Sequence, residues 1–83
     1  MGTMWQINYS RESWSYLADS APYVLELVRF LFTLSLTDEG LPTDECVEIE
    51  PDYYGFEAVG HLIVIHLNRE ERILTVATLK PLE

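Results

Sequence analysis

The sequence predicts a small α+β domain in which a helical hairpin packs on a mainly antiparallel sheet, in the order β-α-α-β-β-β. The chain has 83 residues, of which 48% are hydrophobic, and this suits one domain with a single core. Apolar residues recur at helical spacing in the first half, whereas residues 53–79 form strand-like runs separated by turns. We assign the domain to residues 4–83 and expect residues 1–3 to be a flexible extension, which could be a cloning remnant.

The N-terminal segment predicts one strand followed by one helix. Trp5, Ile7 and Tyr9 alternate with polar residues, which predicts a strand whose apolar side chains face the core. Ser10 can cap the next helix, and Glu12 then lies in the first turn, where the helix dipole favours a negative charge. The apolar stripe expected on this helix follows i, i+3, i+4, i+7 spacing and consists of Trp14, Leu17, Ala18 and Ala21.

A second helix is predicted over residues 22–36, with Ser20 as its cap and Pro22 in its first turn. Its polar stripe is narrow and consists of Glu26, Arg29 and Thr33. The residues expected at the centre of its core face are Val24, Leu27, Val28 and Leu31. We expect the helical hairpin to pack through Trp14, Leu17, Val24, Val28 and Leu31 on Ile7, Val64 and Val76 of the sheet.

The second helix has more apolar residues than one core contact requires. Tyr23 and Phe30 lie on one flank of its core face, and Leu25, Phe32 and Leu36 lie on the other. Because monomers rarely expose a contiguous apolar patch, we expect a partner to cover Leu25, Phe32 and Leu36. That partner is either a second copy of the chain or an amphipathic helix of another protein.

The second half of the chain predicts strands. Gly40 and Pro42 end the helical region, and residues 46–50 alternate as a brief edge strand that Pro51 stops. Longer strands are expected over residues 53–59, 61–67 and 72–79, with a turn at Gly60. Residues 62–65 are continuously apolar, which predicts a central strand buried on both faces.

Charge is the most informative bulk property of the sequence. Five basic and fourteen acidic residues give a net charge of −9, and residues 38–52 contain no Lys or Arg. We expect no nucleic-acid partner, because nucleic-acid binding is normally driven by basic side chains. The acidic run is either a solubilising loop or a docking patch for a basic protein, with Asp44, Glu45, Glu48 and Glu50 as the candidate contacts.

Residue types that carry chemistry are sparse. His61 and His66 stand an odd number of positions apart on one strand, which places them on opposite faces, and with Lys80 they are the only weak catalytic candidates. We expect His61 to be exposed beside its turn. Cys46 can form no internal disulfide, which favours a reducing cytoplasm, and it has no cationic neighbour in sequence to activate it. We predict no metal, no cofactor and no membrane segment.

Three segments resemble the RelE/ParE superfamily of bacterial type II toxins from toxin–antitoxin systems. They are residues 5–12 (WQINYSRE), 54–67 (YGFEAVGHLIVIHL) and 73–80 (ILTVATLK), so the resemblance extends over nearly the whole chain. It implies the fold expected above, with a strand, a helical hairpin and a C-terminal meander. It also implies an antitoxin-like protein partner.

The sequence departs from this superfamily at the positions that carry its ribonuclease activity. RelE-like ribonucleases place Arg or Lys where this chain has Gly55, Phe56 and Glu57, and an aromatic acid or base where it has Pro81 and Leu82. We therefore predict a RelE/ParE-like protein that acts by protein binding without ribonuclease activity. The alternatives are an mRNA endoribonuclease with a non-standard site and an acidic adaptor that shares only the fold.

Overall fold

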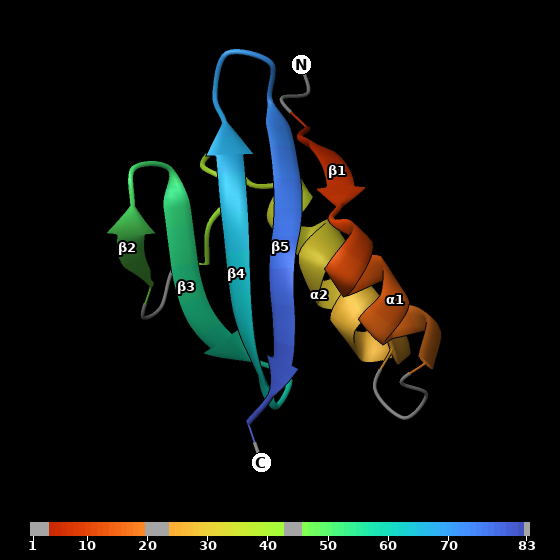
Figure 1. Cartoon of the computed structure of the whole chain (residues 1–83). Coiled ribbons are helices and arrows are strands. Elements are labelled where there is room, and N and C mark those ends of the chain that lie inside the picture. Colours follow the sequence, from red (N-terminus) through yellow and green to blue (C-terminus); the bar gives the residue numbers. More distant parts are fainter. Residues whose placement is uncertain (1–3, 20–23, 43–45, 83) are drawn as a thin grey trace.

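The computed structural model describes residues 4–19, 24–42 and 46–82 of the chain. Two helices and five strands follow one another in the order β-α-α-β-β-β-β (Figure 1). The elements are β1 (Gln6–Tyr9), α1 (Arg11–Asp19), α2 (Val24–Ser35), β2 (Val47–Glu50), β3 (Tyr53–Ala58), β4 (His61–Asn68) and β5 (Ile73–Pro81). The predicted α+β class and helical pair are confirmed, and the brief edge strand expected over residues 46–50 is present as β2, which gives the sheet five strands. Neither helix is long and apolar enough to cross a membrane within the described ranges.

The five strands form one sheet in the order β1-β5-β4-β3-β2. Strand β1 runs parallel to β5, and every other neighbouring pair is antiparallel. Both helices lie on one side of this sheet, next to β5 and β1 (Figure 1). The opposite side, which we call the open face, carries no helix. Strand β4 occupies the centre, as the continuous apolar run predicted.

Strand β4 is not buried equally on its two faces, which corrects the sequence prediction. Its residues on the helix side are fully buried, whereas Leu62, Val64 and His66 on the open face are only half-buried. Val64 was expected to pack under the helices and instead faces away from them, because the alternation of the strand places Ile63 and Ile65 there. The sheet thus has one core face and one partly solvated face.

The start of α1 is fixed by a cap that joins both ends of the chain. The Ser13 amide donates to Ser10 Oγ at 3.1 Å, which confirms Ser10 as the cap. The same hydroxyl donates to the carbonyl of Ala77 at 3.0 Å. Ala77 is the extra residue of a β-bulge, because Val64 pairs with Thr78 whereas Ile65 pairs with Val76.

Helix α1 is rotated relative to the phase predicted from the sequence. Leu17 is buried as expected, but Ser13 takes the second buried position, and Trp14 and Ala18 are exposed. The small Ser13 side chain lets the first turn lie close to the sheet, which turns Trp14 outward against the ring of Tyr9, at a centroid distance of 6.0 Å. The other predicted stripe residue, Ala21, lies outside the described residues, as do Ser20, Pro22 and Tyr23.

Helix α2 packs through a core face centred on Leu27, Leu31 and Leu34. Val24 and Phe30 flank this face and are half-buried against the core. Val28 was predicted to be in the core but is exposed, since about 100° per residue places it at the edge of a face with that centre. The predicted polar stripe is confirmed, with Glu26, Arg29 and Thr33 all exposed.

Trp5 connects the N-terminus to the far end of α2 and to the turn before β5. Its amide donates to the Ser35 carbonyl at 2.8 Å, and its indole Nε1 donates to the Thr37 carbonyl at 3.1 Å. The Arg72 guanidinium stacks 4.2 Å from the Trp5 ring centroid. Gly40, at φ 70°, passes so close that a Cβ there would lie 3.0 Å from the ring. The loop after α2 therefore needs glycine at this position.

Replacing Leu31 with Ala should lower the free energy of unfolding by about 2–5 kcal/mol, because a fully buried side chain would leave a cavity. Leu25→Ala on the same helix is the matched control, since Leu25 is exposed and its loss should cost less than about 0.5 kcal/mol. Urea unfolding followed by far-UV circular dichroism measures both values. Equal losses for the two variants would contradict the helix phase.

Candidate functional site

The three candidate catalytic residues do not form one site. His61 lies on the core face at the start of β4, His66 lies on the open face, and Lys80 pairs with Leu62 on that open face. Leu62 and His66 are four residues apart on β4, which separates Lys80 from His66 by about 13 Å along the sheet. The predicted placement of the two histidines on opposite faces is confirmed. The three side chains therefore cannot act together in one site.

His61 is buried, with 4% of its surface exposed, so its predicted exposure beside the Gly60 turn is wrong. Its Nδ1 lies 2.7 Å from the carbonyl of Val59, and its Nε2 lies 2.6 Å from the hydroxyl of Tyr16 on α1. A carbonyl can only accept, so Nδ1 carries a proton, and in the neutral ring Nε2 then accepts from the Tyr16 hydroxyl. Both ring nitrogens are occupied, and His61 holds α1 against the end of the sheet.

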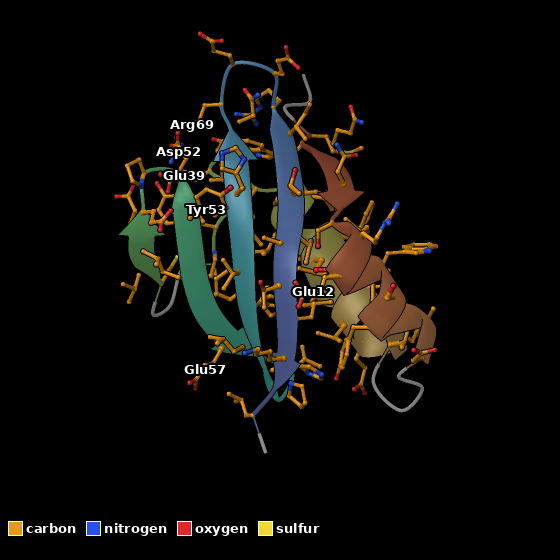
Figure 2. All side chains as sticks on the ribbon, viewed as in Figure 1. Glu12, Glu39, Asp52, Tyr53, Glu57 and Arg69 are labelled. Carbon is orange, nitrogen blue, oxygen red and sulfur yellow. The ribbon has the colours of Figure 1, made fainter. Side chains whose placement is uncertain are left out.

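His66 belongs to a small group of side chains at the other end of β4. Its ring lies 4.7 Å from that of Tyr53, centroid to centroid, and the two planes are tilted by 47°. Asp52 and Arg69 lie at the same end of the sheet, and Arg69 Nε is 3.7 Å from Asp52 Oδ1. Figure 2 shows both side chains near Tyr53. Glu57 lies at the far end of β3 (Figure 2). Asp52 and Glu57 therefore lie at opposite ends of β3 and form no acid–base pair.

The arginines of the second half of the chain have partners within the domain. Arg69 contacts Asp52 and donates to the Tyr54 hydroxyl at 2.8 Å. Arg72 stacks on Trp5 and donates to the carbonyl of Asp38 at 3.3 Å. Lys80 is exposed near the opposite end of the open face. Stabilising a phosphate transition state needs several aligned positive groups, and these three side chains do not converge on one point.

Neither a metal nor a reactive thiol is indicated. Across residues 4–19, 24–42 and 46–82, no three His, Cys, Asp or Glu side chains are grouped closely enough to hold a metal ion. Cys46 is half-buried, and desolvation raises the pKa of its thiol. A raised pKa favours the protonated thiol at neutral pH, which opposes a role as nucleophile.

The partner-binding residues predicted on the second helix form one exposed apolar surface. Leu25, Phe32 and Leu36 are 63%, 51% and 54% exposed. Val28 joins them at 37%. Leu25, Val28 and Phe32 occupy an arc of about 60° around the helix axis, and Leu36 directly follows Ser35, the last residue of the helix. We call Leu25, Val28, Phe32 and Leu36 the α2 stripe. The sequence did not reveal Val28 as part of it, because its neighbour Leu27 gave it a place on the expected core face.

The predicted acidic contacts are only partly described. Glu48 and Glu50 are exposed on β2, at the edge of the sheet. Asp44 and Glu45 lie outside the described residues. Sequence reasoning did not single out Val47 and Ile49, which are exposed on the same strand, although their alternation with the two glutamates indicated an edge strand.

Comparison with solved structures identifies the architecture. A chain of the archaeal RelE–RelB complex from Pyrococcus horikoshii superimposes with a TM-score of 0.73, and the match covers 96% of this chain and 97% of that chain. The chain has a RelE-like fold. The two sequences are 13% identical, so the match shows the fold alone. No protein-family model and no curated protein matches the sequence.

The RelE-like fold confirms the architecture that the sequence resemblance implied. The match extends over β1, both helices and the C-terminal meander, because it covers nearly all of both chains. Within this fold, Gly55, Phe56 and Glu57 lie in the second half of β3 and provide no positive charge there. The chain therefore has the RelE-like framework without a cluster of basic groups on β3.

Tyr16→Phe should destabilise the fold by about 1–3 kcal/mol, because it removes the hydroxyl that satisfies buried His61 Nε2. Tyr54→Phe is the matched control, since its hydroxyl bonds to Arg69 at an exposed position and its loss should cost less than about 0.5 kcal/mol. Urea denaturation of both variants measures the difference. A Tyr16→Phe variant as stable as the control would remove the structural role assigned to His61.

Cys46 should react with iodoacetamide with a pH profile displaced upward from that of a short unstructured cysteine peptide. The raised pKa lowers the thiolate fraction at each pH, and the thiolate is the reacting form. The position of the inflection, rather than the absolute rate, separates this effect from reduced access. Unfolding in urea should return the inflection to the peptide value, and an inflection below that value would indicate an activated thiol.

Proposed function

We propose that this RelE-like chain acts by binding an antitoxin-type protein and does not cleave RNA. The α2 stripe is the observation that carries the proposal, since it is an apolar surface on a helix that the sheet does not cover. The solved neighbour is a RelE–RelB complex, which gives the fold a precedent for a protein partner. The scattered positions of His61, His66 and Lys80 give the ribonuclease alternative no comparable support.

The shape of the α2 stripe favours a helical partner. From Leu25 to Leu36 it extends about 16 Å along the axis, or about three helical turns. Its members recur at a spacing of three or four residues, the pattern by which one helix packs into another. The polar stripe of Glu26, Arg29 and Thr33 borders it directly and would form a hydrated rim. An amphipathic helix laid along α2 would cover the stripe and leave the rim in water.

Phe32→Glu should abolish the complex while the domain stays folded, because a charge at the centre of an apolar contact would be buried without a partner. Thr33→Glu is the matched control, since Thr33 is the adjacent position on the polar stripe. The probe is the product of the gene adjacent to that of this chain, co-produced with it and measured by co-purification and sedimentation. Failure of the unmodified chain to bind that product, or equal binding by both variants, would contradict the proposal.

Sedimentation of the unmodified chain alone tests the second-copy alternative. A dimer that Phe32→Glu converts to a monomer would assign the α2 stripe to self-association and overturn the antitoxin-type partner.

Production of the chain without a partner tests the ribonuclease alternative, because an active enzyme should arrest growth. We expect unimpaired growth and intact mRNA. Growth arrest that His66→Ala or Lys80→Ala relieves would support the enzyme.

A further inference from the structure

The two edge strands of the sheet, β1 and β2, differ in their contacts with the rest of the domain. Strand β1 is tied at its start to the end of α2, where the Trp5 amide donates to the Ser35 carbonyl at 2.8 Å. Strand β2 closes the other edge, has β3 as its neighbour in the sheet, and exposes all four of its residues. Figure 1 shows β2 at one edge of the sheet and the helices near β5 and β1, toward the other edge. An exposed edge strand presents backbone amides and carbonyls to an incoming strand.

The exposed edge also carries apolar side chains. Val47 and Ile49 are 65% and 56% exposed, although both are large branched aliphatic residues. Val47 pairs with Gly55, and Ile49 Cδ1 lies 2.8 Å from the position that a Cβ on Gly55 would occupy. The glycine thus leaves room for Ile49 to lie over β3 on the open face. Tyr53, partly exposed on the same face, extends this apolar surface toward β4.

Charge selects what can pair with this edge. Glu48 and Glu50 are both exposed, and the strand is short and contains a register shift between them. A short strand, charges and a bulge are the devices by which natural edges avoid pairing with identical copies. Two β2 strands side by side would also bring four glutamates together. These features disfavour a second copy and an acidic segment, but they leave the edge attractive to a basic one.

Protection against aggregation alone does not account for β2. An edge that only needs to stay unpaired is best served by polar residues, whereas this one keeps Val47 and Ile49 in water next to its two carboxylates. Glu48 also fixes the turn that ends the strand, because its Oε2 accepts from the Asp52 amide at 3.1 Å. The strand is therefore held in shape, and no described residue pairs with its outer edge or buries its apolar side chains.

We propose that β2 accepts an extended basic segment of a partner protein as a sixth strand. Backbone hydrogen bonds would hold the segment, and its branched aliphatic residues would cover Val47 and Ile49 on the open face. Its Lys or Arg residues would lie beside Glu48 on the other face, and Glu50, at the register shift, would add to the negative charge that attracts them. Four residues of strand span about 14 Å, so a segment of four to six residues is sufficient. The proposal is independent of the α2 stripe and can hold whether or not a helix covers that stripe.

The test uses a synthetic peptide of alternating lysine and valine, acetylated and amidated, added to the ¹⁵N-labelled chain. We expect amide shifts centred on residues 47–50, slower hydrogen exchange in β2, and binding that weakens as salt rises. Two peptides are matched controls: one with glutamate in place of lysine, and one with N-methylated amides along one edge. Shifts centred outside β2, or equal binding by either control peptide, would overturn the proposal.

Charge variants complete the experiment. The double variant E48Q/E50Q keeps the oxygen that accepts from Asp52 and should bind the lysine–valine peptide about two- to thirtyfold more weakly at low salt. The matched control E70Q/E71Q makes the same charge change in the turn between β4 and β5 and should bind normally. If both double variants bound the peptide equally weakly, the weakening would come from the net charge of the protein, and the proposed site on β2 would be contradicted. Phe32→Glu should bind the peptide as the unmodified chain does.

Discussion

Burial of Trp5 is the constraint on which most of the architecture depends. A buried indole directly before β1 must satisfy its N–H inside the protein, and it does so with the Thr37 carbonyl that follows α2. That bond, the Arg72 stack and the close approach of Gly40 bring three distant segments to one side chain. The direction of α2 follows from this anchor, and with it the choice of Leu27, Leu31 and Leu34 as the face that meets the sheet.

Fixing that face also determines what is left in water. A helix of this composition has more apolar residues than its core face can take, so the rotation that buries Leu34 exposes Val28 and completes the α2 stripe. At the sheet edge, Val47 and Ile49 are likewise exposed, and the contact of Glu48 with the Asp52 amide holds the turn that follows them. Both surfaces lie outside the network of Trp5 and His61. The domain can therefore bind through either one without rearranging its core.

The strands were predictable because their signal is local, and the helix phases were less so. Alternation within residues 53–79 and the turn at Gly60 identified β3, β4 and β5 within about two residues of their ends. The side of a helix that faces the sheet depends on packing against residues distant in the sequence. No local pattern indicates that Ser13 rather than Trp14 lies against the sheet and that the Trp14 side chain is exposed. His61 was misjudged for the same reason, since its partner Tyr16 is 45 residues away. Three members of the α2 stripe were predictable from the surplus of apolar residues on that helix, whereas the exposure of Val47 and Ile49 on β2 was not.

The bulge at Ala77 has a consequence for the timing of folding on the ribosome. Its displaced carbonyl receives the Ser10 hydroxyl across 67 positions of sequence, and β1 has β5 as its strand neighbour. While residues 73–81 are still inside the exit tunnel, β1 has no strand to pair with and α1 lacks part of its cap. Nascent chains should therefore keep the N-terminal half open until β5 has left the tunnel, when both helices close onto the finished sheet in one late step.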